Sequence, residues 1–293
     1  MQEDDLDESH HTSPSMMSSY ESDGVRLMFH DSGDGLPVIF LHPTPFDHRY
    51  WMPTIDRLDG MRMIAPDLRG HGESELVATG RILPAGEFLP VPDAPALTIG
   101  QLAQDTLNLL DVLETDQAVF VGCSIGGYIL LELWRRAPER MKGLCFICSK
   151  PQADADAALK QREQTIARIR TEGPSKVMDE MVRTLVGSTS QSRRPQIVRE
   201  LRAEMTLTAE ALIAVQVGLA LRPDSTATVA SISVPTLAIA GGEDKACPPE
   251  QMEAFKGSAG GCKLHVLADA GHLAAYEYPE RVAVLLSDWL KQF

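Results

Sequence analysis

The sequence has no apolar run that approaches the ~20 residues of a membrane-spanning helix. It is also short of positive charge, because 27 lysines and arginines stand against 41 aspartates and glutamates, a formal net charge of −14. An acidic surface repels phosphate backbones and anionic lipids. We therefore expect neither a nucleic acid nor a membrane as a partner.

Cysteine is scarce, and its five copies in 293 residues form no regular framework. Cys145 and Cys148 make a Cys-x-x-Cys pattern inside an apolar run, but residues three apart on a strand point to opposite faces. The sequence offers no second pair to complete a zinc site. We expect buried, reduced thiols, no metal, no cofactor and a cytoplasmic location.

The first residues lack the basic start and the apolar centre of a secretory signal. Residues 1–19 carry five acidic side chains, the pair His10-His11 and several serines. Such a composition predicts a disordered acidic tail, which we favour over a metal role for the two histidines.

Hydrophobic residues make up 44% of the chain, enough for a substantial core. Short apolar runs bounded by Gly, Pro or Asp recur, and near-continuous apolar strands are typical of a parallel sheet buried on both faces. These runs are residues 38–41, 61–65, 118–121, 144–148, 236–240 and 263–267. Residues 24–30 alternate instead, precede a turn at 31–37, and predict an antiparallel hairpin at the sheet edge.

Helical patterns fall between the predicted strands. Thr98 and Gln101 form a capping box at the start of one helix, residues 125–137 form another, and residues 279–293 form a C-terminal one. Strands that alternate with helices predict a doubly wound α/β fold.

Two stretches interrupt this alternation. Residues 76–97 form a long proline-rich loop. Residues 152–222 are wholly helical in pattern, with predicted helices at 155–171, 175–186, 194–205 and 209–221. We expect an acidic tail (1–19), a core in two parts (20–151 and 223–293) and a helical cap (152–222) inserted between them.

The strongest chemical motif is Gly122-Cys-Ser-Ile-Gly126, which follows an apolar strand and precedes a helix. In this context G-x-S-x-G predicts a sharp turn that exposes the serine, with a helix N-terminus behind it to stabilise negative charge. We therefore predict Ser124 as the nucleophile.

A serine hydroxyl needs a base, and the base needs an acid to orient it. Of the eight histidines, His272 alone follows the last predicted strand and precedes the final helix. Asp244 follows the strand before that one, which gives the chain order serine, acid, histidine of this type of fold. Glu243 is adjacent and stays open as the alternative acid.

An oxyanion hole needs two backbone N–H groups. One is predicted at Ile125, directly after the nucleophile. The other must come from the loop after residues 38–41, where Pro43 and Pro45 have no N–H. Thr44 is then the predicted second donor, its hydroxyl is a candidate for a third hydrogen bond, and Phe46 is a poorer alternative.

Together these motifs resemble the α/β-hydrolase superfamily, especially its small cap-bearing esterase, lactonase and C–C hydrolase branch. The resemblance runs from about residue 21 to the C-terminus, and it implies that the Asp67 to Gly72 segment is a structural turn, with no catalytic role for Arg69 or His71. The chain departs from the family pattern at Pro43, where the family usually has glycine, and in the length of the loop 76–97.

We expect a serine hydrolase that acts on a small, apolar ester, lactone or related carbonyl compound, with Phe46, Cys123 and Tyr128 reaching the pocket beneath the cap. The alternatives are a lyase, an acyl transferase, a cyclisation catalyst or a C–C-bond-cleaving enzyme on the same triad, and a ligand receptor without turnover. A homodimer stays open.

Overall fold

The computed structural model describes residues 16–76 and 96–293. In this part of the chain eight strands form one sheet in the order β1-β2-β4-β3-β5-β6-β7-β8. The neighbouring pairs β4–β3, β3–β5, β5–β6, β6–β7 and β7–β8 are parallel, while β1–β2 and β2–β4 are antiparallel. The strands are β1 Met16–Ser22, β2 Val25–Ser32, β3 Leu36–Leu41, β4 Met61–Pro66, β5 Ala118–Cys123, β6 Met141–Ile147, β7 Thr236–Gly241 and β8 Cys262–Leu267.

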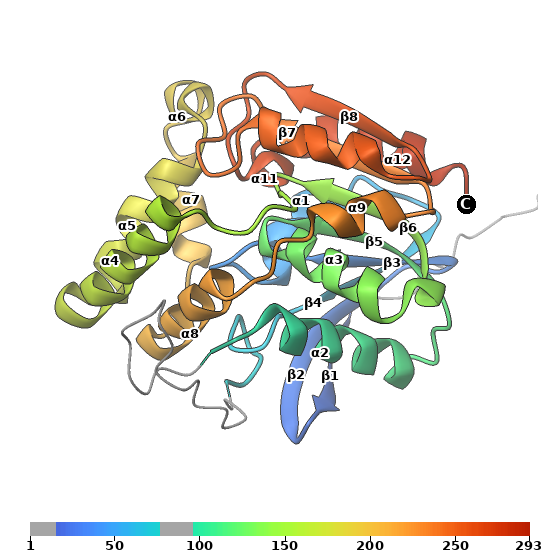
Figure 1. Ribbon diagram of the computed structural model, residues 1–293, viewed down its shortest axis with the longest axis horizontal. Helices are drawn as coiled ribbons and strands as arrows, with labels where there is room; N and C mark the ends of the chain where they lie inside the picture. The colour runs from blue at the N-terminus through green and yellow to red at the C-terminus, as the bar shows by residue number, and fades with distance from the viewer. Residues whose placement is uncertain (1–15, 77–95) are drawn as a thin grey trace, which may run out of the picture.

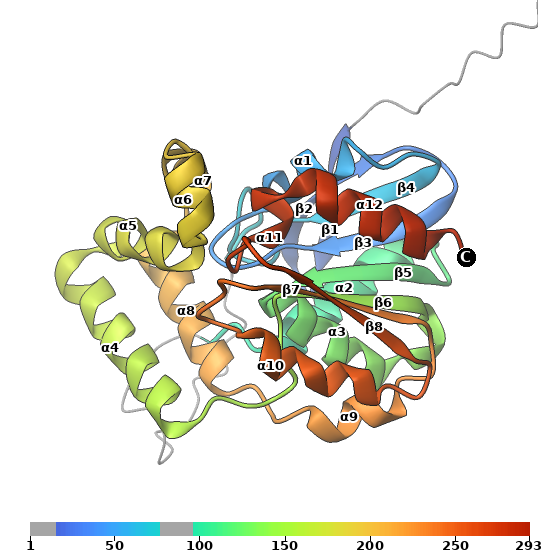
Figure 2. The same ribbon diagram turned by 90° about the horizontal axis from the view of Figure 1, so that it is seen from above.

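Helices cover both faces of this sheet, as Figure 2 shows: α1 and α12 lie on one face, and α3, α9 and α10 on the other, with α2 packed beside α3. This arrangement confirms the predicted doubly wound α/β fold. The longer helices of the core are α2 Ile99–Val112, α3 Ile125–Arg136 and α12 Pro279–Leu290; the shorter elements are η1 His48–Trp51, α1 Met52–Ile55, η2 Pro138–Arg140, α9 Thr226–Ser231, α10 Pro249–Met252, η3 Glu253–Gly257 and α11 Ala274–Glu277.

The predicted edge hairpin is present, but its turn lies before residues 24–30 and not after them. Asp23 and Gly24 both have positive φ (51° and 74°), the geometry of a two-residue hairpin turn, for which Asp-Gly is a strong signal. The hairpin also corrects the expected tail. Residues 16–19 belong to β1, because Met16 pairs with Asp31 and the inward-facing Tyr20 is buried, while residues 1–15 lie outside the described residues.

A helical insertion (α4–α8) separates β6 from β7 and lies at one end of the sheet in both views (Figures 1 and 2). Its helices are α4 Asp156–Glu172, α5 Pro174–Leu185, α6 Ser188–Arg193, α7 Ile197–Glu204 and α8 Ala209–Ala220. Four match predicted helices, and α6 is additional. Every residue of α8 from 211 to 219 is buried, so this helix forms the core of the insertion.

All five cysteines are free, and four of them are buried. Burial raises the pKa of the Cys247 thiol to about 12 and that of the half-buried Cys262 thiol to about 11. The predicted proline-rich loop, apart from its first residue and its last two, lies outside the described residues. Within the described ranges no single helix is long and apolar enough to cross a membrane, and the bent pair α7–α8 passes only by length and composition.

Candidate active site

Ser124 lies at the turn between β5 and α3 with an uncommon backbone conformation. Its φ of 53° and ψ of −113° lie outside the regions that side-chain-bearing residues favour. Such strain persists only where neighbours hold it, and it is concentrated at functional sites. The Ser124 N–H donates to the Ile147 carbonyl (3.0 Å), and the Ser149 hydroxyl donates to the Ser124 carbonyl (2.9 Å). The backbone is thus fixed on both sides, while Ser124 stays partly exposed.

Two glycines allow the turn to be this sharp. A Cβ atom at Gly122 would lie 2.5 Å from the carbonyl carbon of Gly126. A Cβ atom at Gly126 would overlap the carbonyl oxygen of Leu41 in the neighbouring strand β3. Any larger residue at either position would force the turn away from the sheet.

The predicted acid and base meet directly. His272 Nδ1 lies 2.7 Å from Asp244 Oδ2, and both side chains are almost completely buried. The other carboxylate oxygen of Asp244 accepts the N–H groups of Ala246 (2.8 Å) and Cys247 (2.9 Å). Because a carboxylate can only accept, Nδ1 carries the proton and Nε2 is left to act as a base.

Glu243, the alternative acid, points elsewhere. Its carboxylate accepts the Ser188 hydroxyl (3.0 Å), the Thr189 N–H (2.8 Å) and the Thr189 hydroxyl (2.5 Å). The contact with His272 therefore belongs to Asp244.

The loop that carries His272 lies against the ends of β5 and β6. The Cys123 thiol is 3.9 Å from the His272 carbonyl oxygen, and the Cys148 thiol is 3.6 Å from the Gly271 carbonyl oxygen. Since Cys123 directly precedes Ser124, the predicted nucleophile and base lie on adjacent backbone segments. Ser124 Oγ has no hydrogen-bond partner within residues 16–76 and 96–293, and catalytic contacts are often this loose before a substrate binds.

The loop after β3 lies beside the nucleophile, because Leu41 pairs with Gly122 across the β3–β5 ladder. The Phe46 N–H, the poorer predicted donor, is already bonded to the Pro43 carbonyl (3.0 Å). The N–H groups of Thr44 and Ile125 have no partner in the described structure. Neither of the two predicted oxyanion-hole donors is therefore engaged elsewhere among the described residues.

The hydroxyl of Thr44 is not available in the same way. His71 Nδ1 donates to the Arg69 carbonyl (3.0 Å), so His71 Nε2 is an acceptor for the Thr44 hydroxyl at 3.0 Å. Burial lowers the pKa of His71 to about 3, which keeps its ring neutral. The expected third hydrogen bond from Thr44 is thus directed at His71 instead. His71 thus fixes the loop that holds Thr44, a role that the sequence did not reveal.

The three residues expected in the pocket have different positions. Phe46 and Cys123 are completely buried against Tyr50, with a ring-centroid distance of 5.7 Å and a hydroxyl-to-thiol distance of 3.3 Å. Neither side chain has a free surface in this conformation, so both belong to the packing behind the site. Tyr128 is half-buried, and the Arg222 guanidinium lies 4.4 Å from its ring centroid.

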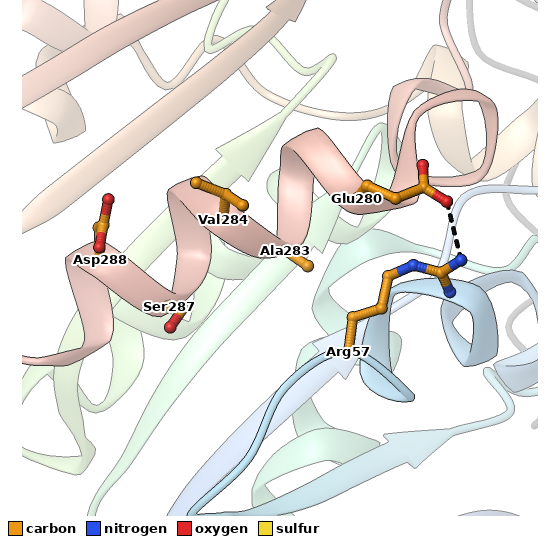
Figure 3. A pocket seen from close by; sticks show the side chains of 6 residues that line it. All are labelled: Arg57, Glu280, Ala283, Val284, Ser287 and Asp288. Atoms are coloured by element: carbon orange, nitrogen blue, oxygen red, sulfur yellow. Dashed lines mark hydrogen bonds and ion pairs between the residues drawn. The ribbon is translucent and has the colours of Figure 1, made fainter.

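A surface hollow between Arg57 and α12 is lined by none of the three predicted triad residues (Figure 3). Arg57 Nη2 spans it to Glu280 Oε1 at 2.7 Å, and its remaining walls are Ala283, Val284, Ser287 and Asp288. The hollow has no histidine to activate Ser287, so it does not compete with Ser124 as a catalytic site.

Among the described residues, Asp47, His48 and Asp67 are grouped closely enough to hold a metal ion. Their polar atoms are already engaged, because Asp47 binds Arg49 through both oxygens and Asp67 accepts His48 Nδ1 at 2.7 Å. These contacts explain why the three residues lie together without invoking a bound metal ion.

Comparisons with known proteins agree with the fold. The sequence model of the alpha/beta hydrolase family matches residues 38–285. A thermophilic esterase from Thermogutta terrifontis superposes with a TM-score of 0.83 at 31% identity, over 96% of this chain and 99% of that one. A 2-hydroxymuconate semialdehyde hydrolase from Pseudomonas sp. is 26% identical over 92% of each chain, and 3-oxoadipate enol-lactonase 1 from Acinetobacter baylyi is 25% identical over 87% of this chain and 88% of its own. The chain belongs to the alpha/beta hydrolase family.

Proposed function

We propose that this chain is a serine hydrolase that cleaves a small ester, lactone or related carbonyl compound through an acyl-enzyme on Ser124. The observation that carries the proposal is the buried Asp244–His272 hydrogen bond, held on loops adjacent to the strained Ser124 turn. Similarity to an esterase and an enol-lactonase supports the substrate class.

In the first half-reaction, His272 Nε2 takes the hydroxyl proton as Ser124 Oγ bonds to the substrate carbonyl carbon. The N–H groups of Thr44 and Ile125 bind the resulting oxyanion, and each such donor is worth about 3 kcal/mol in the transition state. The intermediate then collapses, the bond from carbon to the leaving oxygen breaks, and His272 gives that oxygen the proton.

In the second half-reaction, water loses a proton to His272 and adds to the acyl carbon. Collapse breaks the bond to Ser124 Oγ, releases the carboxylic acid and returns the proton to the serine. Asp244 orients the ring and stabilises the imidazolium in both halves.

We further propose that the helical insertion is a cap that supplies most of a largely apolar pocket. Two features support this assignment. The insertion interrupts the chain between β6 and β7, next to the loops of the proposed triad, and its residues 185–189 bond directly to those loops.

A fluorophosphonate probe, which labels activated serines, tests the proposal. We expect labelling of the wild type, none of Ser124→Ala, and a loss of roughly 10⁴-fold in kcat for Asp244→Asn. Asp288→Asn is the matched control, because this exposed aspartate on the outside of α12 pairs with Lys291, at the end of the same helix. A folded wild-type protein that is not labelled would refute the active serine.

A substrate panel separates hydrolysis of esters from the other reactions of this fold. Short-chain esters, lactones and vinylogous diketones are assayed with the same enzyme preparation. We expect turnover of an ester or a lactone. Turnover of the diketones alone would assign C–C bond cleavage, and labelling without any turnover would favour a transferase or a cyclisation catalyst.

A further inference from the structure

One short segment of the insertion touches both loops of the proposed triad. The α5–α6 junction (residues 185–189) accepts the His272 N–H at the Leu185 carbonyl (2.8 Å). A Cβ atom at Gly187 would lie 2.7 Å from the Gly271 nitrogen and 2.9 Å from Glu243 Oε2. The junction and the histidine loop therefore meet backbone to backbone.

Glu277, the last residue of α11, joins these two segments with one side chain. Its Oε1 accepts the Gly271 N–H and its Oε2 accepts the Gly187 N–H, both at 3.0 Å. Glu277 is 1% exposed. Burial raises the pKa of this carboxyl group, and the nearby Ser190 hydroxyl together with the N–H groups that it accepts oppose the rise.

A buried acid is costly unless its oxygens are satisfied, and here the two backbone donors satisfy it. One donor, Gly271, immediately precedes His272. If the junction shifted, Glu277 would follow it through the hydrogen bond to Gly187 and would displace Gly271 through the other hydrogen bond. The imidazole of His272 would then turn away from Asp244. A misplacement of about 1 Å is enough to cost about 100-fold in rate.

We propose that Glu277 is a positioning residue. Through it, the alignment of His272 with Asp244 depends on how the α5–α6 junction packs against the loop that carries His272. The proposal rests on the catalytic role of His272 given above. Glu243, in the loop that carries Asp244, forms a second link, because its carboxylate accepts hydrogen bonds from Ser188 and Thr189 of the same junction. Whatever holds the insertion in place thereby also holds the base in place.

Two variants test the tie from opposite ends. Glu277→Gln keeps the size of the side chain but replaces one acceptor by an NH₂ group, so one of the two N–H bonds is lost. Gly187→Ala disturbs the tie from the insertion. Gly187 has φ −60° and ψ 144°, which alanine adopts freely, so the disturbance comes from the close contacts of the new Cβ with Gly271, Glu243 and Asp269 and not from the backbone conformation.

Matched controls lie close by. Glu280→Gln removes an exposed glutamate that pairs with Arg57 on α12, and Ser192→Ala changes an exposed position in α6. Each protein is assayed for kcat, KM, probe-labelling rate and the fraction folded. The downfield proton resonance of the His272 Nδ1–H, identified by its loss in Asp244→Asn, reports the hydrogen bond itself.

We expect Glu277→Gln and Gly187→Ala to lower kcat and the labelling rate about 10- to 100-fold with little change in KM, and to broaden or abolish the Nδ1–H resonance. The controls should match the wild type. Unchanged kcat per folded molecule with an intact resonance overturns the proposal, even while the wild type is labelled and active. If Glu277→Gln does not fold, Gly187→Ala and Glu277→Asp decide by the same readouts. A wild type that is itself unlabelled refutes the proposed function instead.

Discussion

Two buried histidines stiffen the loop opposite Ser124. His42 Nε2 accepts the Leu68 N–H (2.9 Å), and His71 Nε2 accepts the Thr44 hydroxyl. Each ring donates its other nitrogen's proton to a backbone carbonyl, and burial lowers the pKa of both. A loop with prolines at positions 43 and 45 is thereby fixed at the one residue between them that has a free N–H.

These histidines give the stability of the protein a dependence on pH. Burial lowers the pKa of His71 from 6.5 to about 3, so between these values the unfolded chain binds more protons than the folded one. The free energy of unfolding then rises with pH through this window. The contribution of the histidine to stability is lost progressively as the pH falls from 6.5 toward 3. The slope is up to about 1.4 kcal/mol per pH unit for each such histidine.

Urea unfolding at pH 5, 6 and 7 measures that slope. His71→Gln retains an oxygen that can accept from Thr44 but removes the titrating group. We expect a shallower loss of stability toward pH 5 in this variant than in the wild type. Equal slopes in the two proteins would mean that His71 does not contribute to the pH dependence of stability.

The proposed triad of Ser124, Asp244 and His272 was predicted from its place in the chain, because each member lies in the turn or loop after a strand and strand order fixes which loops share a sheet edge. The link from His71 to Thr44 was not predictable, because it depends on how the loops after β3 and β4 face each other. For the same reason the sequence assigned Phe46 and Cys123 to a pocket, whereas Tyr50 covers both.

Element boundaries were predictable where a cap or a proline marks them. The Thr98 hydroxyl accepts the Gln101 N–H (3.1 Å) at the start of α2, as predicted. The reciprocal half of the capping box is absent, because the Gln101 side chain donates to Asp23 (3.2 Å) and Asp105 (3.1 Å) instead. The additional helix α6 was missed because its sequence, Ser-Thr-Ser-Gln-Ser-Arg, has no apolar period.

The N-cap of α2 can be tested on its own. Thr98→Ala leaves the Gln101 N–H without its side-chain acceptor and should lower the free energy of unfolding by about 1 kcal/mol. Thr98→Ser keeps the acceptor oxygen and serves as the control. Urea titration of the two variants should separate them by that amount, and equal midpoints would show that the cap contributes nothing.

At the scale of the whole molecule, the insertion is anchored to the core at a second point. Asp154 accepts Arg222 Nη2 (2.8 Å) and Arg162 Nε (2.5 Å), and Arg222 in turn covers Tyr128, one turn after Ser124. Asp154 and Arg222 are almost completely buried. Despite this burial, the two arginines lower the pKa of Asp154.

Removal of this carboxylate takes the counter-charge from the buried Arg222 guanidinium, which keeps only the carbonyl acceptors of Leu219 and Gln152 and the ring of Tyr128 among the described residues. We expect Asp154→Asn to lose about 3–5 kcal/mol of stability, with hydrogen exchange in α4 and α8 rising before that in α3. Asp156→Asn, at an exposed position two residues later, is the control. Uniform acceleration of exchange across the molecule would show that the insertion and the core unfold as one unit.

The contact between Gly187 and Gly271 sets a rule for engineering this scaffold. Because two backbones meet there without side chains, an insertion transplanted from a relative would fit only if it brought a small residue at position 187, to lie against Gly271, and a backbone N–H that Glu277 can accept. With the insertion as the proposed cap, substrate range is best altered by exchanging α4 and the part of α5 before Leu185, while residues 185–189 are inherited unchanged. An exchange that includes residues 185–189 would alter the catalytic rate as well as the choice of substrate.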